Sequence, residues 1–385
     1  MQTKKIIIGA GFAGRQACRA LRGTETEVLL FDPRESSVML PALPDLAGGW
    51  LDESLLFQPL GKCLPKNVRH IQKTVSSIDL DAKTLTADEE TFVFDQLLIA
   101  AGSVTDFHGF DQHLEQVHPL DSLESALRIR DEFSDYLAKE PSPHLVLAGG
   151  GYTGLELATS LHARARTANR LCPVTVIDPA PDILPFLPDT KRNAVKTFLA
   201  LSGVKIIHDT RVDGFDGRNV TADEHVFENV FFCWTGGSKF AIPELKGTLE
   251  TLLDGRIKVN VDLSLPGYPD VFAAGDSSAF KHNNGQILRK AINFAWYEGL
   301  CAGKNMTRRA DGEKTRPFRP VDAGWVIPLH ADSVGQLFGK IWIQGNAGLR
   351  LHYFMCGFRN YNLSNFVGFV SFATKLFKKE APYEN

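Results

Sequence analysis

The sequence has no pair of cysteines at a spacing typical of a metal site or a redox centre. It contains six cysteines, and the two nearest to each other along the chain are Cys18 and Cys63. Neither a bound metal nor a C-x-x-C dithiol is therefore expected. A strong positive charge is also missing, because the net charge is -3. This balance argues against a nucleic-acid partner.

Long apolar runs are absent as well. No uninterrupted apolar stretch approaches the roughly 18 residues that a membrane-spanning helix requires, so the chain is not expected to cross a bilayer. Strand-like residues begin at Lys5, which leaves no room for a signal peptide and predicts a cytoplasmic-facing protein. What the sequence does contain is 385 residues, 44% of them hydrophobic, with 33 glycines. This composition is typical of a globular enzyme of two or three domains.

Two segments share one pattern of residues. The first reads KKIIIGAGFAGRQACRALRGTETEVLLFD and ends at Asp32, and the second reads HLVLAGGGYTGLELATSLHARARTANRLCPVTVID and ends at Asp178. In each, a short apolar run leads into a glycine turn, an apolar-periodic helix and a second apolar run. Each segment is therefore predicted to form a strand, helix, strand unit of a parallel sheet.

The glycines of both turns stand in G-x-G-x-x-G register: Gly9, Gly11 and Gly14 in the first turn, and Gly149, Gly151 and Gly154 in the second. This spacing lets the backbone turn tightly, approach a pyrophosphate and begin a helix whose N–H groups face the phosphates. Asp32 and Asp178 end the following strands, where a carboxylate accepts hydrogen bonds from ribose hydroxyls. A glycine-rich turn without a ligand is the alternative for each. Residues 179–182 offer no arginine to a 2′-phosphate, so NADH is expected over NADPH.

Two dinucleotide sites in one chain have an economical chemical interpretation: FAD stays in one site, NADH visits the other, and hydride passes between them. Segments 95–103 and 229–237 each predict a buried parallel strand that runs into a glycine crossover, and segment 268–280 predicts a third strand, followed by a helix over 289–305. Asp276 ends the third strand and is expected to bind the ribitol of FAD. A helix-capping role is the alternative.

The expected fold class is α/β, with two Rossmann-like nucleotide-binding domains and a short carboxy-terminal membrane-docking element. The FAD domain is expected to comprise residues 1–110 and 254–321, with the NADH domain, residues 111–253, inserted between them. Residues 322–385, rich in Gly, Phe and Tyr with few acids, are expected to form the carboxy-terminal element.

The motifs IIIGAGFAGR, LLIAAGS, GGGYTGLELA, VFAAGD and HYFMCGFRNYNLSNFVGF stand in this order along the chain. In this respect the chain resembles the type II NADH:quinone oxidoreductases, flavoproteins with two dinucleotide-binding domains, over nearly its whole length. The resemblance implies that a proline loop with Pro41 reaches the isoalloxazine ring, and that a helix beginning near Ala291 stabilises the reduced flavin through its dipole. It further assigns cofactor contacts to Val75, Ala101, Gly102, Ile292 and Gly236.

The resemblance also implies three residues at the reaction centre. A glutamate at the place of Glu156 lies near the nicotinamide and the flavin, where it can steer the nicotinamide or relay a proton; an acid favoured by the helix dipole is the alternative. The family's A-Q-x-A-x-Q motif meets the quinone, and here Asn293 and Tyr297 replace its two glutamines. Both can still hydrogen-bond a quinone carbonyl. Phe294 and Trp296 are expected to be packing residues.

Other acceptors remain open. Disulfide reductases of the same superfamily carry a C-x-x-x-x-C pair, and sulfide:quinone oxidoreductases carry two cysteines beside the flavin. This chain lacks the first pattern and has no cysteine in YTGLELATSL, so Cys172, Cys233 and Cys356 are expected to be buried hydrophobic residues. The alternatives to an NADH:quinone oxidoreductase are a sulfide:quinone-type or other flavin reductase with a non-quinone acceptor, and a nucleotide-binding redox sensor.

Segment 366–379 predicts an amphipathic helix. At about 100° per residue, one face carries Phe366, Phe369, Val370, Ala373, Leu376 and Phe377, and the other carries Ser371, Lys375, Lys378 and Lys379. Leu349, Tyr353, Phe354 and Phe358 are expected to add apolar surface, and Arg350 and Arg359 positive charge. This pattern favours docking on an anionic membrane surface, and thus a peripheral protein on the cytoplasmic face. Packing on the protein's own core or in a homodimer is the alternative.

Overall fold

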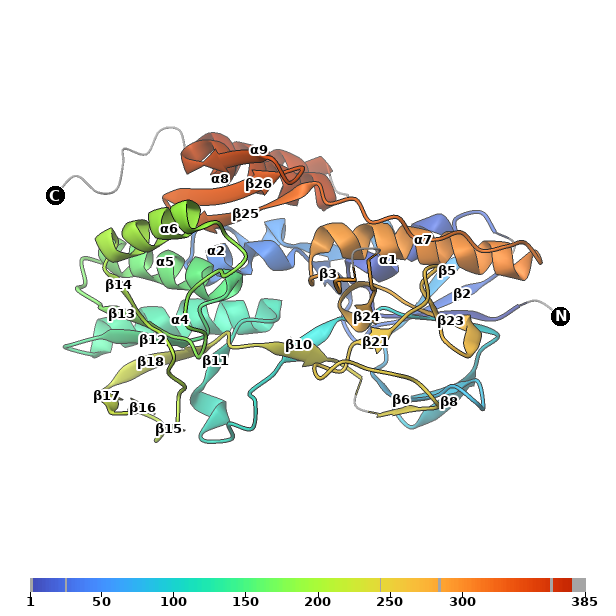
Figure 1. The fold of residues 1–385 in the computed structure, drawn as a ribbon, viewed down its shortest axis with the longest axis horizontal. Helices are drawn as coiled ribbons and strands as arrows, with labels where there is room; N and C mark the ends of the chain where they lie inside the picture. Colours follow the sequence, from blue (N-terminus) through green and yellow to red (C-terminus); the bar gives the residue numbers. More distant parts are fainter. Residues whose placement is uncertain (1–2, 25, 243, 283–284, 361–362, 376–385) are drawn as a thin grey trace. The chain divides into compact units, whose positions relative to one another are not determined.

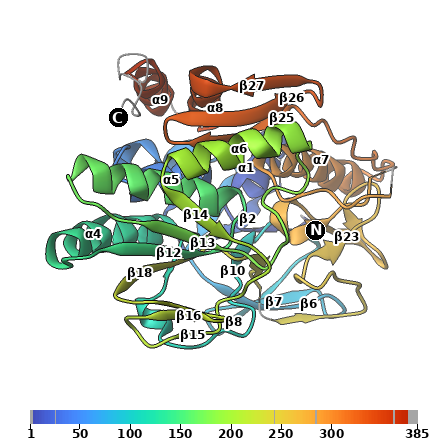
Figure 2. The same cartoon turned by 60° about the vertical axis from the view of Figure 1, so that its left-hand side comes forward.

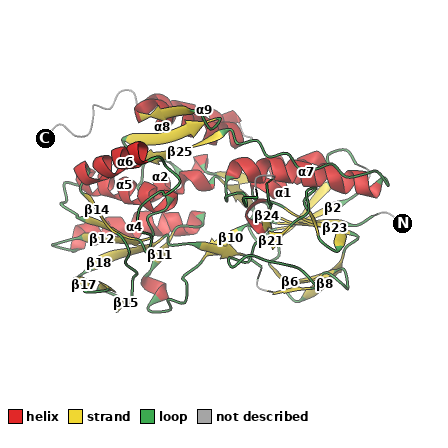
Figure 3. Cartoon of the chain, viewed as in Figure 1, coloured by secondary structure: helices red, strands yellow, loops and turns green. Residues whose placement is uncertain are grey.

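The structure is a computed structural model that describes residues 3–24, 26–242, 244–282, 285–360 and 363–375 (Figure 1). The described residues mix helices and strands along the whole chain (Figure 3). They form two compact units. Unit 1 comprises the residues up to Ser37, Gln58–Val104 and Ser238–Ala323. Unit 2 comprises Val38–Phe57, Thr105–Gly237 and the residues from Gly324 onward.

A six-stranded sheet forms the centre of unit 1. In spatial order its strands are β22 (Ser264–Leu265), β23 (Tyr268–Ala273), β9 (Gln96–Ile99), β1 (Lys5–Ile8), β2 (Val28–Phe31) and β5 (Val68–Ile71). All neighbours run parallel except the β22–β23 pair. All four residues of β1 and all four of β9 are buried, as expected for parallel strands that are covered on both faces.

Two helices of unit 1 pack against each other at very short range. They are α1 (Phe12–Ala20), which follows the first glycine turn, and α7 (Ile292–Ala310) (Figure 1). A Cβ atom on Gly299 would overlap the carbonyl oxygen of Ala13, and one on Gly303 would lie 2.8 Å from the carbonyl oxygen of Ala17. Only glycine permits this approach. The middle of α7 is thereby fixed beside α1.

Smaller elements complete unit 1. A second sheet has the order β20 (Glu244–Lys246), β6 (Val75–Asp79), β7 (Thr84–Ala87) and β8 (Glu90–Val93), and the short elements are α3 (Leu60–Cys63), β21 (Ile257–Lys258) and β24 (Ser278–Ala279). The strands β3 (Ser36–Val38), β4 (Phe57–Pro59), β10 (Ser103–Thr105) and β19 (Ser238–Phe240) lie where the chain passes from one unit to the other.

Unit 2 contains a five-stranded parallel sheet. In spatial order its strands are β11 (His118–Pro119), β18 (Val230–Trp234), β12 (His144–Ala148), β13 (Val174–Ile177) and β14 (Val204–Ile207). The helices that contact it are α4 (Leu123–Lys139), α5 (Tyr152–Thr167) and α6 (Asp189–Leu201). A small antiparallel sheet follows β14 and consists of β15 (Gly214–Phe215), β16 (Val220–Ala222) and β17 (His225–Phe227).

The carboxy-terminal element also belongs to unit 2. It consists of the antiparallel strands β25 (Gly324–Leu329), β26 (Asp332–Leu337) and β27 (Ile341–Gln344) and the helices α8 (Gly345–Arg359) and α9 (Leu363–Lys375) (Figure 2). It contacts residues 38–57, which include α2 (Leu43–Ala47). Tyr353 donates its hydroxyl to Asp45 at 2.8 Å, and the Asn360 amide donates to the carbonyl of Leu55 at 2.8 Å. None of the helices described is both long and apolar enough to span a membrane.

The predicted fold class is confirmed. The strands expected in segments 95–103, 229–237 and 268–280 are β9, β18 and β23, and the helix expected over 289–305 is α7, which begins at Ile292. The unit boundaries at 104/105 and 237/238 lie slightly earlier in the chain than the expected domain boundaries at 110/111 and 253/254. Which unit holds which nucleotide stays a prediction.

The predicted membrane face of the last helix is wrong for the residues described. Phe369 and Ala373 are buried, and the Phe366 ring packs against that of Phe354 with centroids 5.6 Å apart. A Cβ atom on Gly357 would lie 3.1 Å from the Phe369 Cβ. The cause is that α8 covers this face of α9. Leu376, Phe377, Lys378 and Lys379 lie outside the described residues.

The expectations for the preceding helix are met in part. Phe354 and Phe358 are exposed, whereas Leu349, Tyr353 and Arg359 are buried. Arg359 therefore cannot reach a lipid headgroup, and Leu349 and Tyr353 belong to the core of unit 2. The apolar surface that α8 and α9 present comprises the predicted Phe354 and Phe358 together with Leu363 and Val367, which were not predicted.

Candidate nucleotide-binding sites

The first glycine turn joins β1 to α1 in unit 1. Gly9 has a φ of +94°, and a Cβ atom there would overlap the carbonyl oxygen of Ala100. A Cβ atom on Gly14 would in turn overlap the carbonyl oxygen of Gly9. Gly11 is the N-cap of α1, has no side-chain cap, and would have no heavy atom within 4 Å of a Cβ atom. The fold thus needs Gly9 and Gly14, whereas the open side at Gly11 lets a pyrophosphate approach the helix N–H groups.

Asp32 ties the end of β2 to this turn. Its carboxylate accepts hydrogen bonds from the N–H of Ala10 at 2.7 Å and from the N–H and Nη2 of Arg34, both at 2.9 Å. Burial alone raises the pKa of Asp32, but the hydrogen bonds from Arg34 and Ala10 outweigh burial and lower the pKa. The carboxylate is therefore ionised, as required to accept ribose hydroxyls. Sequence reasoning missed Arg34, because nothing in the pattern separates it from an ordinary surface charge.

The second glycine turn, between β12 and α5 in unit 2, repeats this geometry. Gly149 has a φ of +105°, and its Cβ atom would lie 2.7 Å from the Cα of Gly236. A Cβ atom on Gly154 would overlap the carbonyl oxygen of Gly149, whereas Gly151, the N-cap of α5, again has open space around it. The predicted residue Gly236 therefore lies directly against the turn, and its backbone leaves no room for a side chain at Gly149.

Asp178 takes the place in unit 2 that Asp32 has in unit 1. Its Oδ2 accepts the N–H of Gly150 at 2.5 Å, and its Oδ1 accepts the N–H of Ala180 at 2.7 Å. Both repeats therefore end in a carboxylate that is held against the glycine turn. Each repeat supplies a tight turn, an approachable helix start and a fixed acid, and this combination fits a dinucleotide.

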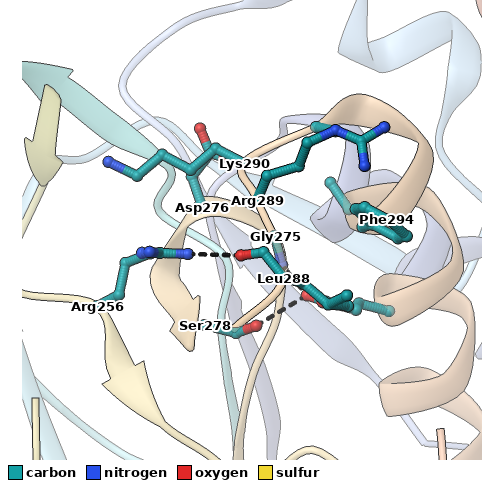
Figure 4. A pocket seen from close by; sticks show the side chains of 11 residues that line it. Arg256, Gly275, Asp276, Ser278, Leu288, Arg289, Lys290 and Phe294 are labelled. Carbon is teal, nitrogen blue, oxygen red and sulfur yellow. Dashed lines mark hydrogen bonds between the residues drawn. The ribbon is translucent and has the colours of Figure 1, made fainter. Parts of the chain in front are cut away.

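A small pocket lies beside the first turn, in unit 1 (Figure 4). Its lining comes from the residue before β21, the turn after β23, the segment before α7 and the first turns of α7: Arg256, Gly275, Asp276, Ser278, Leu288, Arg289, Lys290, Ala291, Phe294, Ala295 and Glu298. Arg256 donates to the carbonyl of Leu288 at 2.9 Å, and Lys290 donates to the Ser238 carbonyl at 2.7 Å. The pocket thus combines basic groups with the predicted ribitol ligand, Asp276.

Several predicted flavin contacts meet near this pocket. Ser103 donates its hydroxyl to Asp276 at 3.1 Å, and the N–H of Gly102 donates to the hydroxyl of Ser277 at 3.2 Å. Burial raises the pKa of Asp276. Ala101 precedes Gly102 in the same crossover, Ala291 is the N-cap of α7, and Ile292 is its first residue. The side chain of Val75, by contrast, belongs to the hydrophobic core, so only its backbone can face a ligand.

The residues predicted for the quinone lie on α7. Asn293 is buried, and its amide donates to the carbonyl of Val321 at 2.5 Å. Tyr297 lies one turn further along the helix and is partly exposed. Phe294 is buried, in agreement with a packing role; its ring also borders the pocket, and the Arg289 guanidinium lies 5.0 Å from the ring centroid. This distance is within the range of a cation–π contact.

Glu156 and Pro41 lie in unit 2. Glu156 is on α5, and its pKa is raised well above the usual value, first by burial and then by the neighbouring Asp45 carboxyl. Asp45 is buried on α2, and burial raises its pKa to about 7 even though Tyr353 donates to it. Pro41 lies in the short turn Leu40–Ala42 just before α2. Sequence reasoning missed the hydrogen bond between Asp45 and Tyr353, because 308 positions separate the two residues and no local pattern joins them.

All six cysteines are free thiols, and Cys172, Cys233 and Cys356 are buried as predicted. Burial raises the pKa of Cys172 to about 12 and raises the pKa values of Cys233 and Cys356 well above their usual range. These thiols therefore stay protonated at physiological pH, which makes them poor nucleophiles.

Comparison with known proteins places the chain in a family. Residues 3–295 match the model of the pyridine nucleotide-disulphide oxidoreductases, and the chain belongs to this family. A type II NADH:quinone oxidoreductase of Staphylococcus aureus (strain bovine RF122 / ET3-1) is 27% identical over 369 residues, which cover 88% of this chain and 90% of that protein.

Two solved structures share the fold. One is NDH2 from Plasmodium falciparum in complex with NADH, with a TM-score of 0.85, 14% identity and complete coverage of both chains. The other is the sulfide:quinone oxidoreductase of Aquifex aeolicus, with a TM-score of 0.78, 20% identity and coverage of 96% of this chain and 92% of that one. The resemblance to type II NADH:quinone oxidoreductases is confirmed, as are the cofactors FAD and NADH and an NADH-dependent flavoprotein oxidoreductase activity.

Proposed function

We propose that the protein oxidises NADH in unit 2 and passes the electrons, through FAD in unit 1, to a quinone in the membrane. Bound FAD supplies the chemistry, since it accepts a hydride and can release its two electrons to a second substrate. The observation that carries the proposal is the repeated turn geometry, because Gly11 and Gly151 are both open helix starts with a fixed acid nearby.

The protein's own groups select and hold NADH. The Asp178 carboxylate accepts the ribose hydroxyls of the adenosine half and repels a 2′-phosphate, so NADH is preferred over NADPH. The start of α5 at Gly151 faces the pyrophosphate. Glu156, two residues after Gly154, steers the nicotinamide and holds a proton.

Protons for quinone reduction are stored in unit 2. Quinone reduction consumes two protons, and Glu156 and Asp45 are neighbouring carboxyls whose pKa values are both raised by burial. Oδ2 of Asp45 is buried without a hydrogen-bond partner among the described residues, which favours its protonated form. The pair therefore carries protons near neutral pH.

A quinone is the electron acceptor that the side chains of α7 are best suited to bind. The partly exposed Tyr297 hydroxyl can donate to a quinone carbonyl, and Asn293 orients the start of α7. Sulfur chemistry of the kind catalysed by a sulfide:quinone oxidoreductase needs reactive cysteines beside the flavin. The buried, protonated Cys172, Cys233 and Cys356 do not offer them.

The membrane contact is an apolar surface on the carboxy-terminal element, here called the docking ridge. It consists of Phe354, Phe358, Leu363 and Val367, whose exposed fractions are 44%, 60%, 77% and 57%. Phe354 and Phe358 are one turn apart on α8, and so are Leu363 and Val367 on α9, so each pair shares one face of its helix. A lipid surface is the partner, since it dissolves the long tail of a membrane quinone and removes these side chains from water.

The test of the acceptor is the Tyr297→Phe variant, which removes only the hydroxyl. Reoxidation of the NADH-reduced enzyme by a short-chain quinone should slow about fivefold, because one hydrogen bond contributes about 1 kcal/mol, whereas reduction by NADH should be unchanged. Both rates are measured by stopped-flow absorbance. The matched control is Tyr268→Phe, since the Tyr268 hydroxyl bonds Asp81 at 2.7 Å, and neither rate should change. An equal slowing of both half-reactions in Tyr297→Phe would count against a quinone contact at Tyr297.

A further inference from the structure

Glu298 is a buried acid that the chemistry proposed above leaves without a role. It lies on α7 four residues after Phe294, so both side chains share the helix face that lines the pocket. The residue is 2% exposed. A buried carboxyl group is costly unless it is satisfied or neutral, which makes its contacts informative.

The hydrogen bonds described for Glu298 come from one turn. Its Oε2 accepts the N–H of Gly275 at 2.6 Å and the hydroxyl of Ser278 at 2.9 Å. These two residues flank Asp276 and Ser277, so the carboxyl group is hydrogen-bonded to both ends of the turn. Gly275 has a φ of +68°, a conformation that glycine adopts without strain. Glu298 therefore helps to fix the shape of this turn from outside it.

The same turn is joined to the rest of the flavin domain at three points. Asp276 accepts the hydroxyl of Ser103 at 3.1 Å, and Ser277 accepts the N–H of Gly102 at 3.2 Å. A Cβ atom on Gly275 would lie 3.2 Å from the Cβ of Ala13 on α1. The turn with Asp276 thus packs beside the first glycine turn. Any displacement of the turn would move Asp276.

We propose that Glu298 is a positioning residue for FAD: it fixes the turn that presents Asp276 to the cofactor, and its protonated form holds FAD more tightly than its ionised form. This proposal concerns FAD binding in unit 1 and does not depend on the quinone as acceptor. Since Oε2 accepts both hydrogen bonds, a proton on Oε1 leaves them intact, and neutral Glu298 keeps the turn in place.

The charges around Glu298 set the direction of the pH effect. Burial raises the pKa of Glu298 to about 8; the Gly275 and Ser278 hydrogen bonds oppose this, Asp276 adds to it, and Arg256 opposes it. On the same helix, burial raises the pKa of the neighbouring Cys301 thiol to about 11, so Cys301 titrates later. Below about pH 8 Glu298 is neutral. Above it, a second buried negative charge appears beside Asp276, at the turn that would present Asp276 to FAD, so FAD affinity falls as pH rises.

The experiment measures FAD release from the holoenzyme by flavin fluorescence, from about pH 6.5 to about pH 9.5. Wild type should release increasing FAD above pH 8, with a loss of affinity of up to about tenfold per pH unit. Glu298→Gln keeps an oxygen that accepts both hydrogen bonds and cannot ionise, so it should retain FAD as wild type does at pH 6.5 and lose the pH dependence. Glu298→Ala should bind FAD at least about tenfold more weakly throughout.

Two further variants complete the design. Asp311→Asn removes an exposed acid at the other end of α7 and should behave as wild type at every pH. Ser278→Ala removes one of the two hydrogen bonds that lower the pKa of Glu298. The pKa of Glu298 should therefore rise, and the loss of FAD should begin at a higher pH, in a protein that is less stable. The proposal is overturned if Glu298→Gln shows the wild-type loss above pH 8, or if Glu298→Ala holds FAD as tightly as wild type. A protein that fails to reduce quinones but shows this pH pattern would refute the acceptor and leave the role of Glu298 standing.

Discussion

The Gly151→Val variant should keep its FAD and lose its reduction by NADH. Gly151 has a φ of -71°, which suits any residue, and no heavy atom lies within 4 Å of its Cβ position. The fold therefore tolerates the valine side chain. Its methyl groups would occupy the space through which the pyrophosphate reaches the start of α5. Several charge-assisted hydrogen bonds are lost, which amounts to about 3 kcal/mol. NADH-driven flavin reduction at low NADH concentration should slow at least about 100-fold.

The mirror variant Gly11→Val separates the two sites. Gly11 is equally open, so Gly11→Val should fold but be isolated without its yellow cofactor. Gly61→Val is the control, because Gly61 is a third glycine with open space around it and no predicted ligand; it should keep both FAD and its reduction by NADH. Absorbance spectra and single-turnover rates report all three. If Gly151→Val lost FAD, or if Gly11→Val kept it and lost NADH reduction, the assignment of nucleotides to units would be reversed.

Removing the docking ridge should detach the enzyme from membranes. In the triple variant Phe358→Ser, Leu363→Ser, Val367→Ser, three exposed side chains lose their apolar surface without disturbing the core. Burial of such side chains in lipid contributes about 1 kcal/mol each when only part of the surface is covered. Vesicle affinity should therefore fall about 100-fold, as measured by sedimentation with anionic vesicles at low salt. Reduction of a short-chain soluble quinone should continue at the wild-type rate.

The control for this variant removes the same kind of surface elsewhere on unit 2. Leu171, Leu201 and Val226 are also exposed, and their replacement by serine should leave vesicle binding unchanged. Equal losses in both triple variants would indicate a general effect of surface hydrophobicity. A wild-type protein that does not sediment with the vesicles at all would assign the ridge to another partner, such as a second subunit.

Local patterns in the sequence were sufficient for both nucleotide-binding repeats. The turns at Gly9 and Gly149 require strand, glycine, helix and acid within about 30 consecutive residues, and each of these parts is visible in the chain. The buried strands were equally clear, because a parallel strand covered on both faces is a continuous apolar run.

Long-range partners could not be predicted in this way. Periodicity identified the residues that share a face of α9, but it does not say what covers the face, and α8 covers it. The contact between Asp45 and Tyr353 joins segments from opposite ends of the chain. Glu298 looked like one more acid on a helix, and its role became visible only when Gly275 and Ser278 were found around it.

The central claim is that one chain carries electrons from NADH through FAD to a quinone. Its most direct test is an anaerobic titration of the wild-type holoenzyme, in which the yellow flavin absorbance is followed while NADH is added and an oxidised quinone is then injected. The account predicts that NADH bleaches the flavin, that NADPH does so more slowly at equal low concentration, and that the quinone restores the colour within the mixing time. A flavin that NADH does not bleach, or one that stays bleached after quinone and recovers only with a sulfur compound or a protein acceptor, would contradict it.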